Sequence, residues 1–127
     1  MTRDTITIQK PIIENSDSVG IEVIVPQAVT VANGISLQGA MECMNNTLFI
    51  IISNTANADS TVTIKKGDKF PNSMLGDLSL VVEQSATTVI QIQDAARFVN
   101  SDCAIDIDFG SGFAGTIYAI GKKVGLE

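Results

Sequence analysis

The stretch Thr47–Lys66, TLFIIISNTANADSTVTIKK, decides the fold of this chain. It opens with the unbroken apolar run Leu48–Ile52, whereas Thr61–Lys65 alternates polar and β-branched apolar residues. An apolar run predicts a strand buried on both faces, and strict alternation predicts a strand with one solvated face. We therefore predict a central strand, a polar loop over Ala56–Ser60 and a second strand that returns antiparallel as a hairpin. A charge at Ile51 should then abolish folding.

Strand signals recur along the rest of the chain. Asn33-Gly34 lies between alternating apolar residues, which is the strongest short signal for a hairpin. Residues 78–93 predict a second hairpin, and residues 99–127 predict a last pair of strands. Turn signals recur roughly every 8–12 residues, as in sandwiches and barrels, and no long helical period appears. The sequence thus predicts an all-β fold, a single antiparallel β-sandwich of immunoglobulin-like or jelly-roll-like type.

The N-terminal residues differ from the rest of the chain. A chain of 127 residues is one domain, which we divide into an extended N-terminal arm at residues 1–20 and a β-sandwich domain at residues 21–127. Thr5–Gln9 alternates like a strand, but Pro11 cannot donate to a ladder, so this piece should lie at a sheet edge or outside the sheets. Such an arm covers its own sheet edge or adds to the sheet of a neighbouring subunit.

Charge and hydropathy exclude two classes of partner. The net charge is −6 and the eight Lys and Arg are scattered, which argues against nucleic-acid binding. The apolar run Leu48–Ile52 is far shorter than a membrane span, so no membrane contact is expected. The N-terminus does not have the pattern of a signal peptide. We therefore expect a protein that is made and kept in a reducing cytoplasm.

The residues that usually carry catalysis are scarce. The chain has no histidine, which removes the commonest general base and metal ligand. Cys43 and Cys103 have no basic neighbours in sequence and are better interpreted as buried core thiols, although a bridge between them stays open. Asp102, Asp106 and Asp108 form the best acidic cluster, but alternation favours a solvated strand face over a calcium site. We predict a non-enzyme with no catalytic residues, no cofactor and no metal site.

The order of segments between Asn46 and Ile120 carries a resemblance. The segments are Ser53-Asn54-Thr55, Thr61–Gly67, Leu78–Val82, Thr87–Ile92, Arg97-Phe98 and Ile117–Ile120. Together they resemble the small β-sandwich auxiliary capsid proteins of tailed bacteriophages, which are called decoration or cement proteins. The resemblance covers about the last two-thirds of the chain. It transfers no functional residues, because such proteins act through a surface.

The resemblance implies a function and a partner. It implies a structural virion protein that binds the major capsid protein on the outer surface of the capsid and stabilises the shell. It also implies a homo-oligomer, with a trimer favoured, located at the capsid surface after synthesis in the host cytoplasm. Deleting residues 2–18 should leave a folded domain but weaken assembly or capsid binding. The alternatives are another phage head or tail accessory protein, or a carbohydrate- or ligand-binding β-sandwich module.

Overall fold

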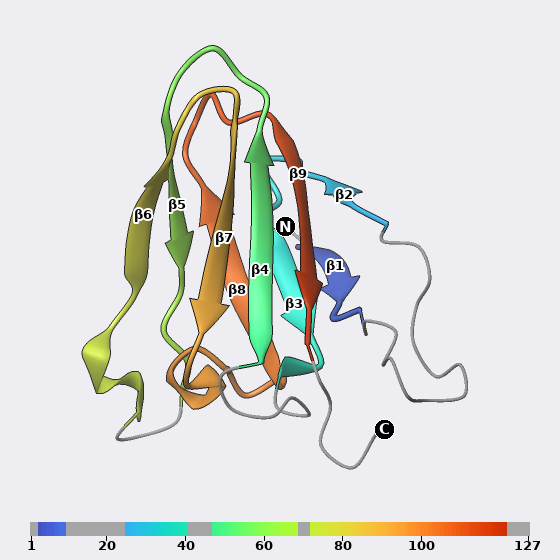
Figure 1. Ribbon diagram of the computed structural model, residues 1–127. Helices are drawn as coiled ribbons and strands as arrows, with labels where there is room; N and C mark the ends of the chain where they lie inside the picture. Colours follow the sequence, from blue (N-terminus) through green and yellow to red (C-terminus); the bar gives the residue numbers. More distant parts are fainter. Residues whose placement is uncertain (1–2, 10–24, 41–46, 69–71, 122–127) are drawn as a thin grey trace.

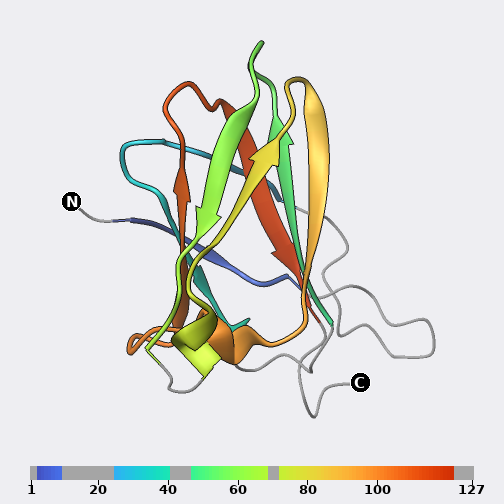
Figure 2. The same cartoon turned by 90° about the vertical axis from the view of Figure 1, so that its left-hand side faces the viewer.

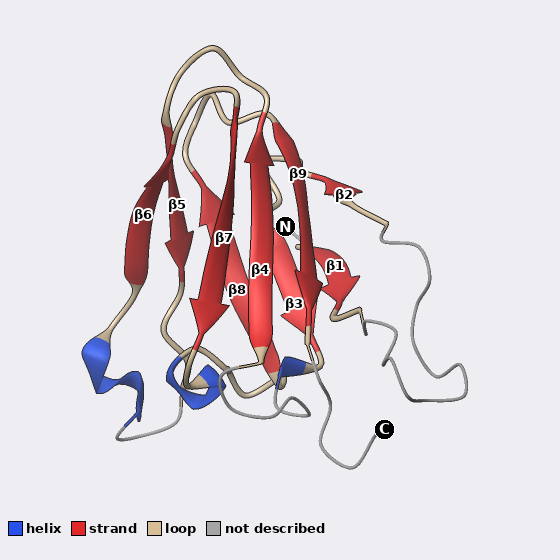
Figure 3. Cartoon of the chain, in the orientation of Figure 1, coloured by secondary structure: helices blue, strands red, loops and turns tan. Residues whose placement is uncertain are grey.

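The protein is a sandwich of two β-sheets (Figure 1), seen here in a computed structural model that describes residues 3–9, 25–40, 47–68 and 72–121. One sheet has five strands and the other has four; we call them sheet A and sheet B. Figure 2 shows the two layers from the side, and Figure 3 shows that strands account for nearly all of the regular structure. The predicted all-β sandwich is confirmed.

Each sheet has a defined strand order. Sheet A runs β1 (Asp4–Thr7), β3 (Ile35–Gln38), β8 (Ala104–Phe109), β5 (Ser60–Ile64) and β6 (Leu78–Val82). Sheet B runs β2 (Gln27–Ala28), β9 (Gly115–Ile120), β4 (Leu48–Asn54) and β7 (Ala86–Ile92). Two short 3₁₀ helices, η2 (Asn72–Leu75) and η3 (Ala95–Arg97), lie together at one end (Figure 2). All strand pairs are antiparallel except β1 with β3, which is parallel.

Strands that follow one another in the chain mostly lie in different sheets. Among the described strands, every consecutive pair except β5–β6 crosses from one sheet to the other, and β5–β6 is the one consecutive pair that is hydrogen-bonded. The resulting orders, β2-β9-β4-β7 over β3-β8-β5-β6, are those of a jelly roll, with β1 added beyond β3. Of the two predicted types, the topology is therefore the jelly roll.

The predicted hairpins are wrong. Within Thr47–Lys66, β4 pairs with β7 and β9, whereas β5 pairs with β6 and β8, so the two strands face each other across the core. Residues 78–93 likewise divide between the two sheets. The turn at Asn33-Gly34 exists, since both amides donate to the Thr30 carbonyl, but β2 and β3 do not pair. Alternation of apolar and polar residues predicts which side chains are buried, but not which strand pairs with which. Two consecutive strands show the same alternation whether they form a hairpin in one sheet or lie in different sheets.

The core fills the space between the sheets. Its fully buried side chains come from both inner faces and include Ile35, Leu37, Leu48, Ile50, Ile52, Val62, Ile64, Val82, Ile105, Ile107 and Ile117. Burying each such side chain contributes roughly 1.5–3 kcal/mol. Strand β4 lies between β9 and β7, which confirms the prediction of a central strand. Its inner face supplies three of these side chains, Leu48, Ile50 and Ile52.

The inner row of β4 ends in a buried amide. Asn54 is 1% exposed and makes three hydrogen bonds. Its Nδ2 donates to the carbonyls of Ala58 (3.0 Å) and Val82 (3.1 Å), and its Oδ1 accepts the Ala56 N–H (3.0 Å). A buried amide with its groups paired avoids the desolvation penalty of an unpaired one. Asn54 thus ties the end of β4 in sheet B to the loop after it and to β6 in sheet A.

The described part of the predicted arm covers its own sheet edge. Ile6 and Ile8 are 8% and 3% exposed and belong to the core. The Gln9 N–H donates to the Ala119 carbonyl (2.8 Å), so the segment passes from β3 in sheet A to β9 in sheet B. Residues 10–20 lie outside the described residues. Because deletion of residues 2–18 would remove two core side chains, we now expect that deletion to destabilise the fold.

Among the described residues there is no helix with the length and apolarity that a membrane crossing requires.

Candidate interaction surface

The outer face of sheet B carries three rows of side chains across β7, β4 and β9, the strands nearest the viewer in Figure 1. The rows are Thr87, Ser53, Thr116; then Val89, Ile51, Tyr118; then Gln91, Phe49, Ile120. Strand neighbours such as Ile50, Ile52 and Ile117 are in the core, and successive side chains point to opposite faces of a sheet. We call these nine residues the sheet B outer face.

None of these nine residues is charged, although the chain carries 14 acidic and eight basic residues. The middle row is apolar: Val89 is 60% exposed, and Ile51 is only 8% exposed because Val89 and Tyr118 flank it. Protein interfaces are depleted of charged residues at their centres and enriched in Tyr and Phe. An exposed apolar patch with a polar margin is typical of a site that contacts another macromolecule.

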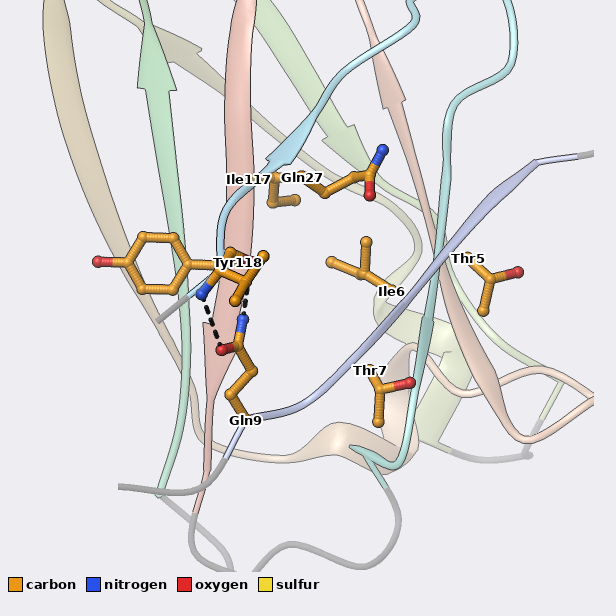
Figure 4. Close-up of a pocket in the computed structure, with 8 residues that line it drawn as sticks. Thr5, Ile6, Thr7, Gln9, Gln27, Ile117 and Tyr118 are labelled. Carbon is orange, nitrogen blue, oxygen red and sulfur yellow. Dashed lines mark hydrogen bonds between the residues drawn. The ribbon is translucent and has the colours of Figure 1, made fainter. Parts of the chain in front are cut away.

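The Tyr118 ring points away from the groove that the residue borders (Figure 4). The groove has a volume of about 330 Å³ and is lined by Thr5, Ile6, Thr7, Gln9, Val25, Gln27, Ile117 and Tyr118. Figure 4 shows the Tyr118 ring pointing away from Ile6, with Thr5 and Thr7 on the opposite side. The Gln9 amide is engaged within the protein, since it donates to the Val25 carbonyl (3.0 Å) and accepts the Val25 N–H (3.1 Å). The Gln9 amide is therefore not available to a bound small molecule, whose orientation depends on a few polar groups that converge on it.

The acidic cluster lies on the outer face of sheet A and holds a guanidinium. Arg3 Nη1 donates to Asp108 Oδ1 (2.6 Å) and to the Ile107 carbonyl (3.1 Å), and Arg3 Nε lies 3.6 Å from Asp106 Oδ2. A Cβ on Gly34 would lie 2.5 Å from Nη1, so the glycine leaves room for Arg3 to reach β8. Asp106 and Asp108 therefore fasten the N-terminal segment to sheet A.

The other candidate site residues do not join this cluster. Asp102 is exposed in the turn before β8 and forms no ion pair with another described residue. Cys103 is an exposed free thiol in the same turn, at φ +61°, so its predicted burial is wrong. The turn places it outside the alternating strand, whose buried positions begin at Ala104. Cys43 lies outside the described residues.

A second exposed apolar element is the tip at η2, which two charged side chains hold in place. Arg97 donates to the carbonyls of Gly76 (3.1 Å), Asp77 (3.4 Å) and Leu75 (3.5 Å). The Asp77 carboxylate accepts the Lys66 N–H (2.7 Å), and this bond, followed by Lys65 at 3.2 Å, lowers the pKa of Asp77. Met74 and Leu75 are 70% and 74% exposed. The Arg97 side chain therefore holds the tip through three backbone carbonyls.

Comparisons with known proteins give no relative for this chain. No protein-family model, no curated protein and no solved structure matches it. The resemblance to phage decoration proteins therefore depends on the sequence segments alone and stays a prediction. Within those segments, the strand end Ser53-Asn54-Thr55 contains the buried Asn54 amide, and Arg97-Phe98 contains the side chain that holds the η2 tip.

Proposed function

We propose that this chain is a structural binding protein that docks on the outside of a phage capsid and stabilises the shell. The sheet B outer face is the docking surface. The observation that carries the proposal is the complete lack of charge on that face in a chain whose net charge is −6. A contact made there buries Val89, Tyr118 and Phe49 without removing any ionised group from water, which is the costly part of forming an interface.

The mode of action follows from binding alone. A subunit that binds the assembled shell and not the free capsid protein shifts the equilibrium toward the shell by mass action. The row of hydroxyl side chains, Thr87, Ser53 and Thr116, borders the apolar middle row, and within it the Ser53 and Thr87 hydroxyls hydrogen-bond to each other (2.9 Å). Such a role requires no catalytic residue, cofactor or metal ion.

The phage capsid enters the proposal through the sequence resemblance. The jelly-roll topology supports it, because jelly rolls build viral capsid domains, but they also build lectins and cupins, so the fold alone decides nothing. The major capsid protein as partner, the location at the capsid surface and a homo-oligomeric state belong to the same proposal. Another phage head or tail surface would present the same kind of contact.

A carbohydrate-binding role is the second candidate. Tyr118 and Phe49 share the sheet B outer face with hydroxyl and amide side chains, and jelly rolls include lectins. The aromatic content is low for such a site, with five Phe, one Tyr and no Trp in the chain. Phe109 and Phe113 are buried against each other, 4.7 Å between ring centroids, and are withdrawn from any such platform.

The test is co-sedimentation of the purified chain with undecorated capsids of the phage that carries its gene. Tyr118→Glu places a charge in the apolar row and should weaken binding by at least about tenfold, as loss of a central contact does. Thr61→Glu, at an exposed position on the outer face of sheet A, is the matched control and should bind like the wild type. Tyr118→Thr, which only removes the ring, replaces Tyr118→Glu if that variant fails to fold.

Two outcomes would overturn the proposal. One is capsid binding that Tyr118→Glu and Tyr118→Thr leave unchanged. The other is a wild-type chain that does not bind capsids but binds defined sugars on a glycan array, together with a Tyr118→Thr variant that does not bind those sugars. The second result would establish the carbohydrate-binding role in its place.

A further inference from the structure

Strand β7 is an edge strand without the usual protection. Among the described strands the sheet edges are β1 and β6 in sheet A and β2 and β7 in sheet B. Natural edge strands are blunted by shortness, charge, proline or bulges. Strand β2 has two residues, β1 begins at Asp4, and β6 lies between Asp77 and Glu83. Strand β7 has seven residues, ATTVIQI, with no charge and no proline.

The backbone of β7 presents hydrogen-bonding groups to that edge. The Thr55 N–H donates to the Ala114 carbonyl (2.7 Å), so odd-numbered residues of β4 direct their backbone groups to β9 and even-numbered residues direct theirs to β7. In the register of β4 with β7, Ile52 is opposite Thr88 and Ile50 is opposite Ile90. The backbone N–H and C=O of Thr87 and Val89 therefore point away from β4, toward the open edge.

We propose that β7 pairs antiparallel with β7 of a second copy of this chain, about a two-fold axis at Val89. Val89 of one copy then lies opposite Val89 of the other, and Thr87 lies opposite Gln91. This register joins residues whose backbone groups point outward, as an antiparallel ladder requires. Such an isologous contact gives a closed dimer and leaves no β7 edge exposed.

The absence of charged residues from β7 allows two copies of this acidic chain to meet along that strand. Two chains of net charge −6 repel each other unless they meet at an uncharged surface, and β7 is such a surface. Beyond the strand, the register sets Glu83 opposite Ala95 and Gln84 opposite Asp94, so no like charges oppose each other.

The same operation on β6 is unfavourable. A two-fold axis at Leu80 would set Asp77 of one copy opposite Glu83 of the other. Directly opposed like charges destabilise a strand pair. Strand β7 is also longer, with seven residues against five, and it is flanked by the uncharged Ser85 and Gln93 where β6 is flanked by Asp77 and Glu83. On both counts β7 is the preferred edge for self-pairing.

If the proposed function is right, this pairing would also double the area of the docking surface, the sheet B outer face. Sheets B of the two copies would become one sheet, and the two sheet B outer faces would lie side by side on the same surface. Two linked contacts then bind a lattice with higher avidity than one. The two-fold contact differs from the trimer that the resemblance implies, so the oligomeric state discriminates between them.

The test is the mass of the purified chain in solution, measured by sedimentation equilibrium at micromolar concentration. The wild type should be a dimer. Val89→Pro should be a monomer, because it removes an N–H that points to the edge and spares the ladder with β4. Val89→Thr keeps the N–H and the β-branched shape, so it should remain a dimer. A monomeric or trimeric wild type, or a dimeric Val89→Pro variant, overturns the proposal.

Crosslinking provides a second measurement that does not depend on proline. In a chain with Cys43→Ser and Cys103→Ser, Val89→Cys should give a covalent dimer on mild oxidation. The opposed Cα atoms of a hydrogen-bonded pair are about 5.5 Å apart, within the range of a disulfide. Thr61→Cys, on the outer face of sheet A, should not crosslink. No covalent dimer at position 89, or equal crosslinking at both positions, contradicts the register.

These measurements use no capsid. A monomer that still binds capsids therefore refutes the β7 contact alone, and a dimer that ignores capsids refutes the proposed function alone.

Discussion

The outer faces of the two sheets differ although their inner faces are alike. Sheet A presents a charged cluster, in which Arg3 pairs with both Asp106 and Asp108, and an exposed threonine on β5. The sheet B outer face presents no charge and has Ile51, Val89 and Tyr118 at its centre. Both inner faces supply the same kind of aliphatic core. The core therefore accounts for the fold, and the difference between the outer faces accounts for the proposed contact.

The largest effect should come from charging the inner face of the central strand. Ile52 is fully buried on the inner face, whereas Ile51 is 8% exposed on the outer face. Ile52→Asp should abolish folding, because an unpaired carboxylate would be buried in the core. The sequence pattern predicts that Ile51→Asp abolishes folding, but the structure places Ile51 on the outer face, where a carboxylate can reach water. We therefore now expect Ile51→Asp to destabilise the protein and leave it folded. Urea unfolding followed by circular dichroism compares the two, and equal damage would contradict the assignment of the faces.

The next effect concerns the amide that joins the sheets. Asn54→Ala leaves the carbonyls of Ala58 and Val82 without their donor. We expect a loss of about 1–3 kcal/mol in the free energy of unfolding. Thr55→Ala is a control at an exposed neighbouring position, where one hydroxyl bond to the Ala114 carbonyl is lost, and it should cost less. Denaturant midpoints measure both, and an Asn54→Ala protein as stable as Thr55→Ala would contradict this role.

A smaller effect should come from the ion pairs of sheet A. Arg3→Met removes the contacts to Asp106 and Asp108, whose side chains are 31% and 46% exposed. Partly exposed ion pairs contribute little, so the expected cost is at most about 1 kcal/mol and should shrink in high salt. Thermal unfolding at low and high salt measures it. If Arg3→Met unfolded the protein, the outer face of sheet A would have a structural role that its exposure does not suggest.

The smallest effect is a pH dependence at the η2 tip. Because the folded-state pKa of Asp77 lies below its ordinary value of 3.8, the carboxylate stabilises the fold above that pH. This contribution is lost as the pH falls through the folded pKa. Asp77→Asn should therefore lose less stability than the wild type between neutral and strongly acidic pH. Melting temperatures across that range give the comparison, and parallel pH profiles would exclude Asp77 as the cause.

Local patterns in the sequence predicted the buried faces but not the strand pairing. Ile105 and Ile107 are buried as the alternation predicts, with Asp106 and Asp108 on the opposite face. The prediction of hairpins was wrong because two strands that lie in different sheets show the same alternation as two strands of a hairpin. The prediction that Cys103 is buried was wrong because the residue lies in a turn, where the alternation of a strand does not apply.

The candidate surface had a partial signal in the sequence. Leu48–Ile52 is apolar on both faces, which predicts that the outer side of this strand is covered. Among the described residues, the neighbours of Ile51 within the sheet are Val89 and Tyr118, one on either side. The register that brings these three together joins segments far apart in the chain, and no local pattern specifies it.

The most direct test of the central claim is a cryo-electron microscopy reconstruction of a capsid with this chain bound. Sheet B should face the shell, with Tyr118 and Val89 within contact distance of the capsid protein and with Asp106 and Asp108 turned toward solvent. A reconstruction in which the outer face of sheet A meets the shell, while Tyr118 is exposed to solvent, would contradict the account.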